Sequence, residues 1–83
     1  MAEDRELVAL LKTGNEDALE QLIMRWRSRA EAYANSILHD SQSAEDAVQE
    51  AFSRIYAVRT CLDEDRSFSA YLYTTVQIEI GRA

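Results

Sequence analysis

The chain has 83 residues, 47% of them hydrophobic, and a formal net charge of −6 at pH 7. This length fits one small domain with a thin margin of stability, so we expect a single unit over residues 1–83. An acidic chain attracts nucleic acid poorly by itself, because neutralisation of phosphate supplies most non-specific affinity. The composition therefore disfavours an autonomous DNA-binding protein, but not one that reads a strand held by a larger assembly.

Residue usage narrows the class further. There is no proline and there are only two glycines, which permits long helices and disfavours tight hairpins. The single cysteine, Cys61, cannot form an internal disulfide, which fits a reducing cytoplasm. No window is apolar enough to span a bilayer, so we expect a cytoplasmic protein with no membrane association.

The first predicted helix covers residues 4–12. Its spacing places Leu7, Leu10 and Leu11 on the inner face, and acidic residues in its first turn favour the helix dipole. Gly14 follows as a left-handed cap.

The second predicted helix, over residues 16–38, has the strongest periodicity in the chain. Asn15 serves as its N-cap, and the apolar stripe keeps helical spacing through Ala18, Leu19, Leu22, Ile23, Trp26, Ala30, Tyr33, Ala34 and Ile37. The stripe includes Trp26, so we expect a core role rather than a base-stacking one. Three arginines flank it, and they either contact phosphate or simply line a solvated face: Arg25, Arg27 and Arg29.

A third helix follows a polar turn and begins with a cap at Ser41 or Ser43. Its inner face comprises Ala44, Ala47, Val48, Ala51, Phe52, Ile55 and Val58, and its outer face comprises Asp46, Gln49, Glu50 and Ser53. On spacing alone, the outer face is either a solvated surface, with Glu50 paired to Arg54, or a docking surface. In the turn, His39 has no second ligand at a spacing that would make a metal site.

Two motifs carry a family resemblance. AEDAVQEAF at residues 44–52, followed after an acidic loop by FSAYLY at 68–73, resembles region 2 of bacterial RNA polymerase sigma factors, with the extracytoplasmic-function group as the nearest match. The resemblance runs from about Glu6 to Arg82. It implies an all-α fold, a compact three-to-four-helix bundle, in which the first motif docks on the β′ clamp helices of RNA polymerase core. The residues implied for docking are Asp46, Gln49, Glu50, Ser53, Arg54 and Tyr56.

The same resemblance assigns DNA recognition to the acidic loop and the last helix. In sigma factors this loop helps to form a pocket for a base flipped from the minus-ten non-template strand; the other interpretation is a solvated connector with Leu62 against the core. The residues implied for DNA binding are Arg59, Asp63, Arg66, Ser67, Tyr73, Thr74 and Gln77.

For the last helix, Ser67 is the expected cap. Its inner side is expected to comprise Phe68, Tyr71, Leu72, Thr75 and Val76. The alternating Val76, Ile78 and Ile80 are typical of a strand, whereas the resemblance predicts helix.

The match to the family weakens toward the end of the chain. Primary sigma factors have two tryptophans where Thr74 and Thr75 stand, and many extracytoplasmic-function members have Arg-Asn where Gln77 and Ile78 stand. Region 4, which would read the minus-thirty-five element, is absent from the 83 residues, so the chain is either a domain cut from a longer protein or a stand-alone region 2.

Three hypotheses about function follow. In the first, the chain binds polymerase core and, within the holoenzyme, recognises and melts the minus-ten element. In the second, it is an adaptor or a target of an anti-sigma factor that does not read DNA. The third, an enzyme, lacks a phosphate loop, a matched nucleophile and base, or a metal constellation, so we expect no catalysis, no cofactor, no metal and no small-molecule ligand.

Overall fold

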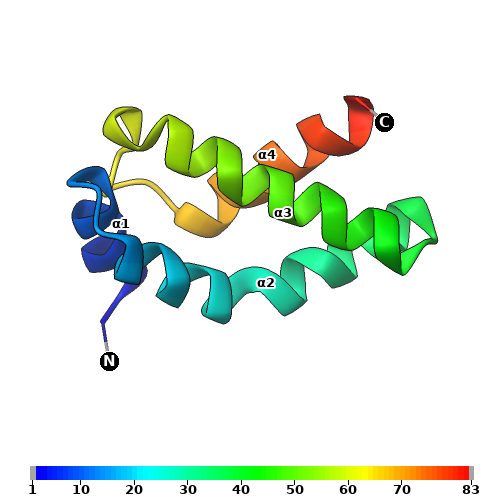
Figure 1. Cartoon of the computed structure of the whole chain (residues 1–83), viewed down its shortest axis with the longest axis horizontal. Helices are drawn as coiled ribbons and strands as arrows, with labels where there is room; N and C mark the ends of the chain where they lie inside the picture. Colours follow the sequence, from blue (N-terminus) through cyan, green and yellow to red (C-terminus); the bar gives the residue numbers. More distant parts are fainter. Residues whose placement is uncertain (1, 83) are drawn as a thin grey trace.

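Four α-helices and one 3₁₀ turn make up the computed structural model of the chain, which describes residues 2–82. They are α1 (Asp4–Lys12), α2 (Glu16–Leu38), α3 (Ser41–Ala57), η1 (Arg59–Cys61) and α4 (Phe68–Arg82). The helices α2 and α3 form a hairpin, α4 packs behind α3, and α1 covers the open end of the hairpin (Figure 1). The predicted all-α bundle is confirmed, and the stretch with a strand pattern after Val76 is helical.

The turn between α1 and α2 forms as the sequence predicts. Gly14 has a φ angle of +91°, which a residue without a Cβ adopts readily. Asn15 is the N-cap of α2, because its side-chain oxygen accepts a hydrogen bond from the Ala18 amide at 3.0 Å. Helix α2 therefore starts after a turn of only three residues, 13–15, which holds the two helices close together.

The cap of α3 differs from the prediction. Asp40, rather than Ser41 or Ser43, is the N-cap. Its carboxylate accepts a hydrogen bond from the backbone amide of Gln42 at 3.2 Å. Ser43 instead donates its hydroxyl hydrogen to the same carboxylate at 2.8 Å. A carboxylate has enough acceptor sites for both bonds. With Asp40 as the cap, the helix begins at Ser41, one residue earlier than a Ser41 cap and three residues earlier than a Ser43 cap would allow.

The core draws on all four α-helices. The largest fully buried side chains are Leu7, Leu11, Leu22, Val48, Ile55, Leu72 and Val76. No helix among residues 2–82 combines the length and apolarity that a membrane crossing requires.

Four residues predicted to lie inward are exposed: Leu10, Ile37, Val58 and Tyr71. In α1, Val8 takes the buried place expected for Leu10, since either residue can share a helix face with Leu7 and Leu11. Val58 lies just past the end of α3, where it is the C-cap and no longer follows the helical spacing.

An acidic side chain ties α1 to α2. Asp4 accepts a hydrogen bond from Arg25 at 2.6 Å and a second from the Trp26 indole nitrogen at 2.9 Å. Arg25 also donates to the Ala2 carbonyl at 2.7 Å. Trp26 is half-buried, and the Arg29 guanidinium lies over its ring at 5.1 Å. Neither interpretation of the arginine cluster anticipated these internal contacts of Arg25 and Arg29.

The end of α2 offers a test of backbone strain. His39 is the C-cap in the left-handed region, with φ of +55°, where a side chain is unfavourable. We expect His39→Gly to raise the free energy of unfolding by about 0.5 to 1 kcal/mol, because glycine adopts this conformation without a Cβ penalty. Urea denaturation followed by circular dichroism measures the change. His39→Ala is the control, since it keeps the Cβ; an equal gain in that variant would mean that the imidazole ring, not the backbone, is unfavourable.

Candidate functional site

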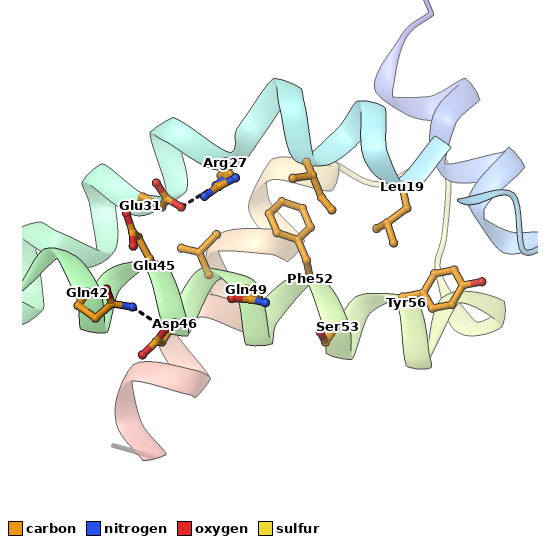
Figure 2. A pocket seen from close by; sticks show the side chains of 12 residues that line it. Leu19, Arg27, Glu31, Gln42, Glu45, Asp46, Gln49, Phe52, Ser53 and Tyr56 are labelled. Carbon is orange, nitrogen blue, oxygen red and sulfur yellow. Dashed lines mark hydrogen bonds and ion pairs between the residues drawn. The ribbon is translucent and has the colours of Figure 1, made fainter. Parts of the chain in front are cut away.

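A groove of about 560 Å³ runs between α2 and α3 on the outside of the hairpin (Figure 2). The residues that line it are Leu19, Ile23, Arg27, Glu31, Gln42, Glu45, Asp46, Val48, Gln49, Phe52, Ser53 and Tyr56. Its floor is apolar, since the buried Val48 and Phe52 of α3 meet the half-buried Leu19 and Ile23 of α2. Its rim is polar, so the groove has the apolar centre and the solvent-accessible polar rim that are typical of a protein-binding site.

The groove brings together four of the six residues predicted for docking. Asp46, Gln49 and Ser53 are exposed along its α3 edge, and Tyr56 lies at one end with its hydroxyl pointing outward (Figure 2). Asp46 accepts a hydrogen bond from the side-chain amide of Gln42 at 3.1 Å. Glu50 is exposed on the same helix but lies outside the groove, and it has no ion-pair partner within residues 2–82.

The sixth residue, Arg54, points elsewhere. Its guanidinium forms an ion pair with Glu79 on α4, and the pair with Glu50 that the solvated-surface alternative included is not formed. The Glu79 side chain is only 7% exposed, and its Oε1 atom has no hydrogen bond of good geometry. Arg82, at 4.0 Å, is the second cation near this carboxylate. The pair joins α3 to α4, because a buried carboxylate is stable as an anion only beside a positive charge.

The side of the groove that α2 forms was not predicted as a functional surface; it consists of Leu19, Ile23, Arg27 and Glu31. Leu19 and Ile23 read as core positions in the sequence, but the groove leaves them half-buried. Arg27 pairs with Glu31 at 2.9 Å, and this hydrogen bond raises the pKa of Arg27. The spacing of four residues between them was the available signal, but a solvated helix face has the same spacing.

The groove is suited to an amphipathic partner. Its apolar floor can accept aliphatic side chains, and the carboxylates Glu45 and Asp46 on the α3 rim can accept paired hydrogen bonds from arginine. Within residues 2–82, no three His, Cys, Asp or Glu side chains lie close enough together to hold a metal ion.

A second candidate surface is the segment 59–67, which the structure brings together with the start of α4. The Arg59 guanidinium lies 4.3 Å from the Tyr56 ring centroid and donates to the Tyr56 carbonyl at 2.9 Å. Asp63 faces Arg66 at 3.6 Å, and the Arg66 side chain is 85% exposed. Ser67 caps α4 as predicted, with its hydroxyl accepting from the Ala70 amide at 3.2 Å. Arg66 is therefore the residue of this segment most available to a phosphate.

Three further residues predicted for DNA binding lie along α4, beyond the segment. Tyr73 packs edge-on against Tyr33 of α2, with the ring centroids 5.1 Å apart. Gln77 donates its amide hydrogen to the Tyr33 hydroxyl at 2.5 Å. Thr74 is exposed, and its hydroxyl bonds to the Ala70 carbonyl. Tyr73 and Gln77 thus make internal contacts with α2, which leaves Thr74 as the most accessible of the three.

Comparisons with known proteins identify the family of this helical bundle. The chain belongs to the Sigma-70 region 2 family, whose sequence signature matches residues 22–82. It is 28% identical over 71 residues to the RNA polymerase sigma-H factor of Pseudomonas aeruginosa, a match that covers 86% of this chain and 37% of that relative. The chain therefore spans little more than a third of the length of this relative.

A solved structure supports the same assignment. An engineered region 2 of sigmaE, determined by NMR in complex with GTAAAA, superposes with a TM-score of 0.89 at 26% identity. The superposition covers 98% of this chain and 84% of that one. The four-helix arrangement is thus that of a sigma region 2 domain.

The Arg54–Glu79 pair makes a testable contribution to stability. We expect Arg54→Ala to lower the free energy of unfolding by about 1 to 3 kcal/mol, because it leaves a buried carboxylate with only the more distant Arg82; the range allows for a half-exposed guanidinium. Chemical denaturation at neutral pH measures the loss. Arg27→Ala, which removes the arginine of an exposed pair, should change stability little. Equal losses in the two variants would show that burial of Glu79 does not matter.

Proposed function

We propose that the chain is the polymerase-docking and promoter-contacting region 2 of a sigma factor of the extracytoplasmic-function group. Its groove and the exposed outer face of α3 bind the β′ clamp helices of RNA polymerase core, and the segment 59–67 with the outer side of α4 meets the minus-ten strand. The role is one of binding, without catalysis or a cofactor. A polymerase partner would place the chain in the cytoplasm.

The observation that carries the docking role is the groove itself. An apolar floor lies directly beside polar side chains that the family resemblance assigns to docking: Asp46, Gln49, Ser53 and Tyr56. Carboxylates on such a rim favour a partner rich in arginine, because charge-assisted bonds give both register and affinity. A solvated helix face alone would not require an open apolar floor at its edge.

The DNA-contacting role has narrower support. Arg66 and Thr74 are exposed where the family motif expects contact with the strand, and the sigmaE region 2 that this chain resembles is in complex with GTAAAA. A net charge of −6 makes binding dependent on the polymerase, which would hold the strand against this surface.

A second candidate function is an adaptor, or an anti-sigma target, that docks without reading DNA. The contacts of Tyr73 and Gln77 with Tyr33 favour it, because side chains engaged internally are less available to bases. Cross-linking of promoter DNA to the segment 59–67 within a polymerase complex decides between the two functions. A cross-link at this segment rules out the adaptor, and contact limited to polymerase subunits supports it.

Docking is tested by removing single carboxylates. We expect Asp46→Ala and Glu50→Ala each to weaken binding to polymerase core, and to an isolated β′ clamp-helix fragment, by about 1 to 3 kcal/mol with helicity unchanged. Pull-down and titration calorimetry measure the affinity, and circular dichroism checks the fold.

Glu20→Ala is the matched control for docking, since it removes one exposed carboxylate of α2 outside the groove. If this control weakens binding as much as the two α3 variants, the attraction is a general effect of net charge, and the assignment of docking to the groove and the outer face of α3 is wrong. Unfolding of either α3 variant would contradict the exposed position of its side chain.

A further inference from the structure

The segment 59–67 is held against α1 by two ion pairs. Lys12 Nζ lies 2.8 Å from Glu64 Oε2, and Arg5 lies 2.9 Å from Asp65. Figure 1 shows the segment at the same end of the molecule as α1. Residues near the start of the chain therefore contact the loop that we expect a nucleic-acid strand to meet.

Few other contacts fix the shape of this segment. Arg59 contacts Tyr56 at one end and Ser67 caps α4 at the other. Between them, Asp63 pairs with Arg66 and accepts a hydrogen bond from the Asp65 backbone amide. Leu62, at 7% exposed, is the only buried side chain between residues 59 and 67. Two backbone hydrogen bonds lie within the segment: the Leu62 amide donates to the Arg59 carbonyl, and the Arg66 amide donates to the Asp63 carbonyl. A loop with one apolar anchor has a small free-energy difference between its conformations, so a pair of charges can decide which one is populated.

The two ion pairs are not equivalent. The side chains of Lys12 and Glu64 are 32% and 34% exposed, whereas those of Arg5 and Asp65 are 68% and 70% exposed. The hydrogen bond between Lys12 and Glu64 raises the pKa of Lys12 and lowers the pKa of Glu64. An exposed pair contributes little, because water and salt screen it. Lys12 is therefore the principal contact, and Arg5 is an auxiliary one.

Charge makes the same contact relevant to DNA. Two arginines and three acids give residues 59–67 a formal charge of −1, and the two α1 cations change it to +1. Without these cations, the carboxylates would repel a phosphate backbone.

We propose that Lys12 is a positioning residue that fixes the segment 59–67, through Glu64, in the shape that the promoter strand meets. This inference rests on the proposed function of the segment. Lys12 lies ahead of residues 22–82, over which the family signature matches, so it acts on the site from outside the matched region.

The test uses Lys12→Glu, Glu64→Lys and the double variant that exchanges the two charges. The first readout is the heteronuclear NOE of the backbone amides at 63–67, which reports the order of the loop without any DNA. We expect both single variants to lower it and the double variant to restore it. Unchanged loop order in the single variants, or no recovery in the double variant, would overturn the proposal.

The second readout, measured with the chain bound to RNA polymerase core, is the preference for a fluorescent GTAAAA strand over the scrambled AATAGA strand. Plain attraction to phosphate predicts that Glu64→Lys binds both strands more tightly with no loss of preference. Positioning predicts that this variant loses preference despite its added positive charge, by about threefold or more, and that the double variant recovers it. Arg5→Glu should have a smaller effect than Lys12→Glu on both readouts, and a larger effect would overturn the ranking of the two pairs.

The two readouts separate this proposal from the proposed function. If the native chain shows no preference for GTAAAA but the charge exchange controls loop order, the positioning role of Lys12 stands and DNA reading of this strand fails. If the native chain prefers GTAAAA and the single variants keep that preference, DNA reading stands and the positioning role fails.

Discussion

The packing of α3 between α2 and α4 is the constraint on which the rest of the structure depends. Its inner face is buried at five positions, Ala44, Val48, Ala51, Phe52 and Ile55, which leaves one outward row of polar residues. Near the turn, the fully buried alanines of α2, Ala30 and Ala34, allow the two helices to approach closely. Along the outer edge of the same helix pair, the groove extends from Glu31 and Gln42 near the turn to Leu19 and Tyr56 at the other end. One helix pair thus contributes both to the core and to the candidate binding surface.

The balance of charges determines which partners this surface favours. The chain has nine Lys and Arg residues, and all of them make internal contacts: seven are in ion pairs, and Arg29 and Arg59 lie over aromatic rings. The excess acids, including Glu50, are left to solvent. A basic partner can therefore bind without breaking an internal pair, whereas a phosphate must compete for a cation that already has a partner. This asymmetry explains why docking on a basic protein surface has stronger structural support than DNA contact.

Much of the local structure could be predicted from the sequence because its causes are local. The bounds of α1 and α2 follow from apolar spacing together with the Gly14 turn and the Asn15 cap, which involve neighbouring residues only. The choice between Val8 and Leu10 depends on which helices pack against α1, and spacing does not contain that information. The pairing of Arg54 with Glu79 and the open groove arise from contacts between different helices, so neither was predicted. The family resemblance predicted the six docking residues of α3, and the structure shows which of them line one groove.

The Arg54–Glu79 pair also bears on how the two surfaces relate to each other. Arg54 lies on α3, which carries the residues predicted for docking, and Glu79 lies on α4, which carries candidate DNA contacts. Sliding α3 past α4 would separate a buried carboxylate from its nearest cation, which is strongly unfavourable. The buried side chains of both helices, among them Ile55 and Leu72, resist the same movement because close-packed cores do not deform continuously. Docking on one side of α3 is therefore expected to hold α4 in a fixed orientation, as a rigid platform rather than a conformational switch.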